Sequence, residues 1–332
     1  MFSPNSIQVV VFLNLICTTL SLDDGKINYE RFCYEDKSCG PDSEDWGGLC
    51  KTGRQQSPID LPAFPFYRHA RRVYLDFNDQ YCNDGKFDSK IKFSSDLKVQ
   101  VDLFLFVILN DSTYTTNNSK TLFSLEFWIV DNGHTIQVTL ESELTSSARM
   151  YGYEQSSPYI FAQIHFHWGN DSVGSEHSIN KEFYPMEAHL VHYSSKYANF
   201  SAAVASGDPT ALAVIAVFIT EGYYWSGDSG LETIVANIPK LNATPTHIPE
   251  RIDLSTFLPD EDAHFYRYLG SLTTPACNEV VQWTVVKHPI YVRPSLLNKF
   301  RRVKRSDHRR IGANFRPTQE LGDRIVQYLA KK

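Results

Sequence analysis

An alternating stretch at residues 163–168 constrains the fold of this chain more than any other part of its sequence. It reads Gln-Ile-His-Phe-His-Trp, so polar and apolar residues alternate with a period of two. On a β-strand, positions i and i+2 point to the same face, whereas on a helix they diverge. Gln163, His165 and His167 therefore share one face of an expected strand, and the apolar residues between them occupy the other face.

A third histidine, His189, follows in a second apolar run. A lone His-x-His pair is more often a pair of hydrogen-bonded strand histidines, and the third histidine is what favours a metal. Three neutral imidazoles that converge from neighbouring strands leave a fourth tetrahedral position open, as in catalytic zinc sites. The predicted ligands of a Zn2+ ion are therefore His165, His167 and His189.

Short alternating runs continue over most of the chain, with turn signals such as Asp131-Asn132-Gly133 between them. Helical patterns are fewer and short. This distribution predicts a single mostly-β (α+β) domain around a large twisted, mainly antiparallel sheet with short peripheral helices. We expect strands at residues 122–130, 135–140, 160–168, 187–192, 211–220 and 280–286, and helices at 228–236, 295–302 and 193–206.

The N-terminus carries an apolar run at residues 9–17. The run is too short to span a bilayer and stands where a secretory signal peptide is expected. We therefore expect a signal peptide at residues 1–21, a mature domain at 22–332 and a secreted, extracellular protein. The chain ends without a hydrophobic tail, so we expect no membrane anchor.

Charge excludes one class of partner. The formal net charge of −6 argues against a nucleic acid held by phosphate contacts. The basic segment at residues 301–310 is interrupted by apolar and acidic residues, and it is expected to be a solvated loop.

In a secreted protein, cysteines can form disulfides and N-x-S/T sequons can be glycosylated. Removal of Cys17 with the signal peptide leaves five cysteines, so at least one is unpaired or bonds another chain. Five N-x-S/T sequons predict glycosylation at the surface, at Asn110, Asn117, Asn170, Asn199 and Asn242.

Residues 79–120 stand apart, with Asn-, Asp- and Ser-rich patches around an apolar segment, and they include Cys82. A stretch of this length without a clear place in the domain is unusual. It is either a surface excursion or sequence wrongly retained in a gene model, and the sequence leaves both open.

Four segments, at 163–169, 174–177, 187–192 and 271–275, read QIHFHWG, GSEH, EAHLVH and SLTTP. In this order they resemble the α-class carbonic anhydrases, and the resemblance runs from about residue 32 to 321, broken by residues 79–120. Details at 46–50, 266–270 and 276–277 are most similar to the extracellular, disulfide-bonded branch. The resemblance implies zinc-dependent reversible hydration of carbon dioxide to bicarbonate and a proton, by attack of a zinc-bound hydroxide.

Each zinc-binding imidazole needs a partner at its other ring nitrogen, which fixes its tautomer and orientation. Gln163 and Glu187 each lie two residues from a ligand on the same strand face, so both are placed for this task. By resemblance they orient the first and third histidines, and the backbone carbonyl of Asn314 orients the second. The resemblance also pairs Thr273 with Glu176: the threonine hydroxyl accepts a hydrogen bond from the hydroxide and donates a hydrogen bond to the carboxylate.

Regeneration of the hydroxide requires a proton to leave the site, and histidine is suited to this near neutral pH. His134 matches the family's shuttle position, although a histidine in a turn is equally compatible with an ordinary exposed residue. Tyr34 and Asn132 match residues that order the water path. Gln137 occupies a cavity position that is often polar in the family.

Carbon dioxide is small and apolar, so its pocket should be a small hydrophobic wall beside the metal. Taken singly, each wall residue reads as ordinary core. Small aliphatic residues at two of the positions leave room for the substrate. The residues that match the pocket by resemblance are Val191, Val214, Leu272, Thr274, Val281 and Trp283.

The same resemblance pairs Cys50 with Cys277 and Cys33 with Cys39. Cys82 then remains for an intermolecular disulfide in a protein otherwise expected to be a monomer. Two other functions stay open: a catalytically weak or inactive extracellular binding or matrix protein, and a zinc hydrolase of esters or amides. Loss of a zinc histidine usually marks the first, and all three are present; the small wall does not favour the second.

Overall fold

A computed structural model describes residues 32–63, 72–75, 106–109, 113–116, 119–122, 127–140, 148–151, 158–222, 228–239, 244–258, 264–304 and 309–331. The expected signal peptide, Cys82, Asn110, Asn117 and Asn242 lie outside these residues. The strands are β1 (Asp60–Leu61), β2 (Arg72–Leu75), β3 (Phe106–Leu109), β4 (Thr113–Thr116), β5 (Ser119–Leu122), β6 (Phe127–Asp131), β7 (Ile136–Leu140), β8 (Ala148–Tyr151), β9 (Tyr159–Trp168), β10 (Ser178–Ile179), β11 (Met186–Ser194), β12 (Leu212–Glu221), β13 (Thr246–Ile248), β14 (His264–Gly270), β15 (Val281–Val292) and β16 (Gln327–Lys331).

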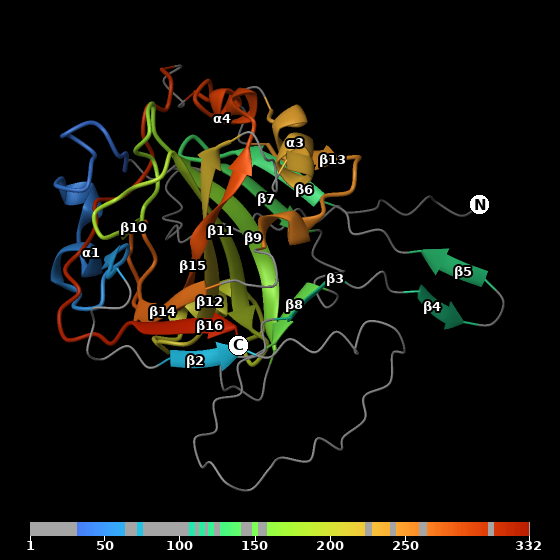
Figure 1. Ribbon diagram of the computed structural model, residues 1–332, viewed down its shortest axis with the longest axis horizontal. Coiled ribbons are helices and arrows are strands. Elements are labelled where there is room, and N and C mark those ends of the chain that lie inside the picture. The colour runs from blue at the N-terminus through green and yellow to red at the C-terminus, as the bar shows by residue number, and fades with distance from the viewer. Residues whose placement is uncertain are drawn as a thin grey trace, which may run out of the picture.

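A twisted sheet of 12 strands forms the centre of the molecule, and the helices are short and peripheral (Figure 1). Its main path runs β13-β6-β7-β9-β11-β12-β15-β14-β16-β2, and β8 joins β3 to β9. Pairing in this sheet is antiparallel except between β12 and β15 and between β16 and β2. The predicted mostly-β architecture is confirmed. The helices are α1 (Leu49–Thr52), α2 (Phe200–Ala205), α3 (Asp228–Ala236) and α4 (Pro294–Phe300), with 3-10 turns η1 (Glu44–Trp46) and η4 (Leu254–Phe257).

The alternating pattern of β9 separates a polar face from an apolar one. On the apolar face, Phe166 contacts the rings of Phe257 and Phe300, with centroid distances of 6.0 and 5.0 Å. Phe257 belongs to η4 and Phe300 to α4. The peripheral elements therefore cover one face of the sheet, and the histidine-bearing face is left for a site.

The expected strands and helices are present with shifted ends, and one expectation was wrong. Residues 193–206 do not form one helix, because β11 continues to Ser194 and only α2 is helical. Tyr193 keeps the strand alternation and packs in the core. The side chain of Asn199 then accepts a hydrogen bond from the backbone N–H of Ala202 and caps α2.

Part of the segment 79–120 joins the central sheet. Strand β3 pairs with β8, and β8 pairs with β9, whereas β4 and β5 form a separate two-stranded hairpin. The rest of this segment lies outside the described residues. Its status as a family-atypical insertion stays a prediction.

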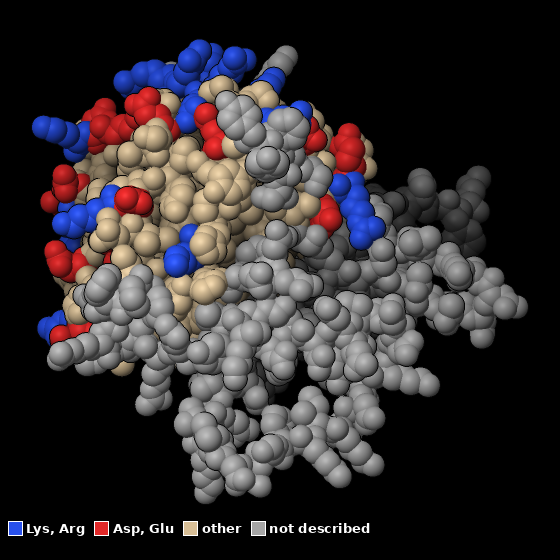
Figure 2. All heavy atoms as spheres, viewed as in Figure 1, with Lys and Arg blue, Asp and Glu red and all other residues tan. Residues whose placement is uncertain are grey.

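The surface agrees with a solvated basic segment. Arg302, Lys304 and Arg310 are exposed, and Figure 2 shows Lys and Arg side chains gathered over the region of α4. Arg301 is half-buried and donates to the backbone carbonyls of Gly169 and Asp171. Among the described helices, none combines the length and apolar character needed to cross a bilayer.

Candidate metal centre

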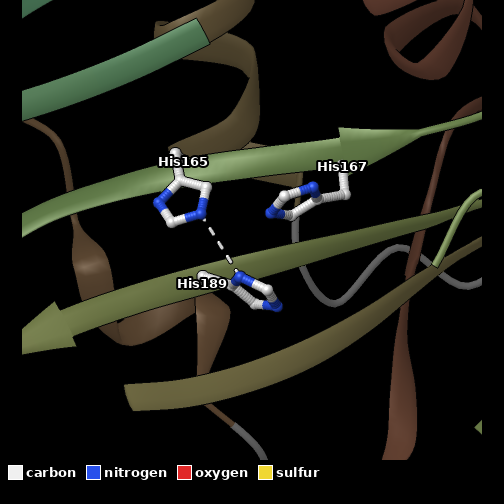
Figure 3. A group of neighbouring side chains, drawn as sticks. All are labelled: His165, His167 and His189. Carbon is white, nitrogen blue, oxygen red and sulfur yellow. Dashed lines mark hydrogen bonds between the residues drawn. The ribbon is translucent and has the colours of Figure 1, made fainter. Parts of the chain in front are cut away.

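Three imidazoles meet on the polar face of two neighbouring strands. Antiparallel pairing of β9 with β11 sets His165 opposite His189 and His167 opposite Glu187. Ring centroids are 5.0 Å apart for His165 with either other histidine, and 4.6 Å for His167 with His189. Figure 3 shows the three rings facing one another, and one nitrogen of each lies within 4.8 Å of the others.

Two of the rings are held by their outward nitrogens. Oε1 of Gln163 lies 2.8 Å from Nδ1 of His165, and the backbone carbonyl of Asn314 lies 2.7 Å from Nδ1 of His167. Both partner atoms are acceptors, so both Nδ1 atoms carry the proton. Each Nε2 is consequently left with a lone pair that points inward.

Glu187 holds the third ring, because its Oε1 lies 2.7 Å from Nε2 of His189. The inward nitrogen of this ring is therefore Nδ1, which is 3.3 Å from Nε2 of His165 with no proton between them. Nε2 of His167 is buried and has no hydrogen-bond partner among the described residues. Lone pairs that face one another repel, and a cation between them removes that repulsion, so the three nitrogens could hold a metal ion such as zinc with one open position.

Burial keeps the three ligands neutral. Desolvation, followed by repulsion from the imidazole of His189, lowers the pKa of His167 to about 3. Desolvation also lowers the pKa of His165 well below its usual value, and it lowers that of His189. Neutral imidazole is the form that binds metal, so loading the site at neutral pH displaces no ring proton.

Glu187 connects His189 to a second buried histidine, His177, to which the sequence assigned no role. Nδ1 of His177 lies 2.7 Å from Oε1 of Glu187, and its backbone N–H donates to Oε2 at 2.8 Å. Nε2 of His177 is 2.6 Å from the hydroxyl of Tyr268, which donates to Oγ of Ser57 at 2.9 Å. Burial by itself would raise the pKa of Glu187, but the contacts with the two histidines hold it well below its usual value. The GSEH motif contained His177, but nothing in the spacing indicated Tyr268, 91 residues away.

A second carboxyl group, that of Glu176, lies 3.5 Å from Nδ1 of His167 and is fully buried. It accepts a hydrogen bond from the backbone N–H of Arg316 at 2.9 Å and another from the side chain of Thr273. Burial raises the pKa of Glu176 well above its usual value, and the two hydrogen bonds oppose that shift. The Thr273–Glu176 pair, which rested on resemblance alone, is thus brought together in the fold.

An apolar wall stands beside the imidazoles. Strand register sets Val191 opposite Val214, and Val214 opposite Trp283. Trp283 contacts the ring of His189 edge-on, with centroids 4.8 Å apart. Leu272 and Val281 are buried in the same cluster, and Thr274 is half-buried. These residues give the side of the imidazoles next to Trp283 an apolar lining.

Comparison with known proteins agrees with this geometry. The family model described as eukaryotic-type carbonic anhydrase matches residues 79–330. Putative carbonic anhydrase 5 of Caenorhabditis elegans is 30% identical over 303 residues, which cover 90% of this chain and 81% of the relative. Carbonic anhydrase 6 of Homo sapiens is 35% identical over 231 residues, covering 62% and 71% respectively. Carbonic anhydrase-related protein of Homo sapiens is 33% identical over 215 residues, covering 60% and 71%.

The chain belongs to the eukaryotic-type carbonic anhydrase family.

Within this carbonic anhydrase domain, His134 lies in the turn between β6 and β7. The side chain of Asn132 accepts hydrogen bonds from the backbone N–H groups of His134 and Thr135, and Gly133 adopts a positive φ of 84°. The His134 ring stacks on Phe32, which the sequence motifs did not single out. Gln137 lies opposite His165 in the β7–β9 register, so it borders the metal ligands.

Tyr34 lies in the N-terminal segment, with its ring edge-on to Phe32 and Trp46. Burial raises the pKa of Tyr34 well above its usual value, and the nearby carboxyl of Glu176 adds to the shift. The phenol therefore stays protonated and keeps a hydrogen atom to donate.

Both expected disulfides are present, Cys33–Cys39 and Cys50–Cys277. The second connects the N-terminal segment to the loop that carries Thr273. Arg316 reinforces this link, because its guanidinium donates to the carbonyls of Cys50 and Ser57 at 3.0 and 2.7 Å. These bonds agree with the disulfide-bonded, extracellular branch of the carbonic anhydrases.

Proposed function

We propose that this protein is a secreted zinc enzyme that reversibly hydrates carbon dioxide to bicarbonate and a proton. One observation carries the proposal: three buried imidazoles present unprotonated nitrogens to a common point while their outward nitrogens are all held. A bound zinc ion lowers the pKa of water to near neutrality and so supplies the nucleophile, a property known from carbonic anhydrases themselves rather than from this structure.

Thr273 and Glu176 orient the attack. The Thr273 hydroxyl donates a hydrogen bond to the carboxyl group of Glu176, so its oxygen is free to accept a hydrogen bond from the attacking hydroxyl group. That bond directs a lone pair toward the carbon of the substrate. Holding the reactants in one orientation removes much of the entropic barrier to their reaction.

The apolar wall binds carbon dioxide, and His134 moves the proton. The apolar surface beside Val191 and Val214 suits uncharged carbon dioxide, whereas charged bicarbonate is poorly solvated there and leaves. His134 is half-exposed at the turn after β6, so it receives a proton from the site and releases it to buffer. Tyr34 and Asn132 are proposed to order the water between the two.

The disulfides and the exposed glycosylation sites support the proposal that the protein is secreted. The two disulfides form in an oxidising compartment. Asn170 and Asn199 are exposed and accessible to glycosylation, and the Asn199 side chain caps α2 through its oxygen, which leaves its nitrogen for a glycan. We expect cleavage after about residue 21, a monomer, and residues 79–120 as a family-atypical insertion. Peptide mapping of the secreted protein checks the cleavage site and the presence of residues 79–120, and light scattering checks the monomer.

The test compares the intact protein with a His189→Ala variant, both secreted from an oxidising host. Zinc content and stopped-flow hydration of carbon dioxide are measured together. His192→Gln is the matched control, because His192 is equally buried on the same strand but faces away from the ligands. We expect the intact protein and the control to hold one zinc per chain and to be active, and His189→Ala to lose both properties.

The outcomes also separate the competing functions. An intact protein that retains zinc yet hydrates carbon dioxide no faster than His189→Ala is a binding protein rather than an enzyme. Turnover of an ester or amide that greatly exceeds hydration would instead favour a hydrolase.

A further inference from the structure

The backbone and the ring of His134 are held by different parts of the molecule. Its N–H donates to the side chain of Asn132 at 3.0 Å, and its carbonyl accepts from Nδ2 of Asn314 at 2.9 Å. Its ring lies flat on Phe32, with centroids 4.0 Å apart and planes 8° from parallel. Hydrogen bonds therefore place the main chain, and an aromatic stack supports the imidazole that is proposed to carry the proton.

Two other aromatic rings of the N-terminal segment pack against Phe32. It meets Trp46 edge-on at 5.5 Å and Tyr34 edge-on at 5.8 Å, and only 8% of its surface is exposed. Edge-to-face contacts at these distances are favourable and directional. The plane that Phe32 presents to His134 is thus set by its own neighbours.

The disulfide Cys33–Cys39 closes a small loop directly after Phe32. Inside the loop, the backbone N–H of Cys33 donates to the carbonyl of Cys39 at 2.7 Å. Nε1 of the fully buried Trp46 donates to both carbonyls, at 3.1 Å for Cys33 and 3.2 Å for Cys39. One indole therefore holds the two ends of the loop and also packs against the ring that precedes it.

A second anchor joins the loop to the segment that holds the His134 backbone. Oε2 of Glu35, inside the loop, accepts from the backbone N–H of Gly312 at 3.3 Å. Gly312 lies two residues before Asn314, whose side chain reaches the His134 carbonyl. The loop and the turn are therefore tied to one common segment.

We propose that the Cys33–Cys39 loop positions the proton shuttle, with Phe32 as the positioning residue that transmits the loop's geometry to the His134 ring. This inference rests on the proposed function, because it presumes that His134 carries the proton. The ring contacts of Phe32 among the described residues are with Tyr34, Trp46 and His134, none of which is a proposed metal ligand, so Phe32 acts through His134. Loss of the stack frees the imidazole to rotate, which slows proton release to buffer and leaves the attack on carbon dioxide unchanged.

The first test measures the position of the ring without using activity. Proton NMR of the His134 ring, assigned by comparison with a His134→Ala variant, reports the ring current of Phe32. We expect Phe32→Leu and the Cys33→Ser/Cys39→Ser double variant to lose the ring-current shift. Phe32→Tyr should keep it, since tyrosine presents the same face. An unchanged shift in Phe32→Leu would overturn the proposal.

The second test separates proton release from the attack on carbon dioxide. In weak buffer, we expect Phe32→Leu and the double cysteine variant to lower kcat by about 10-fold, with kcat/KM unchanged and kcat restored by concentrated imidazole. Leu49→Ala is the matched control: Leu49 is 41% exposed in the same N-terminal segment, and its removal should change neither quantity.

Three results would contradict the proposal: an equal fall of kcat and kcat/KM in Phe32→Leu, no rescue by imidazole, or a normal kcat in His134→Ala. If the double cysteine variant misfolds, the test still stands, because Phe32→Leu and Phe32→Tyr leave both disulfides in place. If the intact zinc-loaded protein fails to hydrate carbon dioxide, the proposed function fails. The NMR comparison still decides whether the loop holds the His134 ring.

Discussion

Different interactions hold the metal centre and the N-terminal segment in place. The three histidines of the candidate metal centre stand on paired strands, and each ring donates a hydrogen bond to an oxygen of Gln163, Asn314 or Glu187. The segment at residues 32–63 has only two short helical turns and one two-residue strand. Two disulfides, stacked rings and the buried guanidinium of Arg316 hold it in place.

The contrast separates two tasks within one site. Metal binding requires ligands fixed to within tenths of an ångström, and a sheet with hydrogen-bonded partners provides that rigidity. Proton release requires a side chain that meets solvent, and a turn braced by a loop provides that exposure. Changes in the sheet should therefore alter metal binding and attack, whereas changes in the N-terminal segment should alter stability and proton release.

Removal of Cys50–Cys277 should have the largest effect on stability. This disulfide joins residues 227 apart, so its loss frees far more chain in the unfolded state than the loss of Cys33–Cys39, which joins residues 6 apart. Loop-closure entropy gives about 5 kcal/mol for the first and about 2 kcal/mol for the second. Urea unfolding of Cys50→Ala/Cys277→Ala and Cys33→Ser/Cys39→Ser, each against the intact protein, measures the difference.

The same pair of variants sharpens the contrast between the two regions. Zinc content at saturating zinc should be unchanged in both, because no ligand lies in the N-terminal segment. Equal losses in the free energy of unfolding would show that loop length does not determine how much each disulfide contributes to stability. Loss of zinc from either folded variant would show that the segment supports the metal ligands directly.

Replacement of Thr273 should have the next largest effect, and on catalysis alone. Thr273→Ala removes the hydroxyl that links the attacking group to Glu176, so we expect kcat/KM to fall about 100-fold with zinc still bound. Thr273→Ser keeps the hydroxyl and should retain most of the activity. Stopped-flow hydration with parallel zinc analysis checks both variants, and an active Thr273→Ala would remove this residue from the mechanism.

The sequence predicted the sheet-borne part of the site better than the rest. Alternation with a period of two is enough to place Gln163, His165 and His167 on one face, because the geometry of a strand allows no other arrangement. Residues 193–206 were misassigned, since a polar turn between β11 and α2 has no periodic signal. The roles of His177 and Tyr268 were missed because their contact joins segments far apart in the chain. The stack of His134 on the N-terminal segment was missed for the same reason.

Glu187→Gln tests how far the metal centre depends on its buried network. Oε1 of Glu187 faces ring nitrogens of both His177 and His189, and Oε2 accepts from the His177 backbone. A glutamine places an NH2 group at one of these positions, so one donor loses its acceptor. We expect zinc affinity to fall about 10-fold, measured by competition with a chelator. Glu182→Gln, an exposed change just before β11, is the control, and an equal affinity in the two variants would contradict the role of the network.

A final prediction concerns Asp131, which ends β6 beside the turn that carries His134. Asp131 is 2% exposed, and burial raises its pKa from 3.8 to about 6, although the backbone N–H of Gly133 donates to it. A raised pKa means that the protonated carboxyl stabilises the fold, fully so below about pH 3.8, and that this contribution is lost as pH rises through about 6. Asp131→Asn stays neutral and keeps an oxygen for Gly133, so at pH 8 it should be more stable than the intact protein by about 3 kcal/mol. The gain should vanish below about pH 4. Urea midpoints at three pH values measure it, with exposed Asp42→Asn as the control, and a gain independent of pH would show that burial of the charge is not its cause.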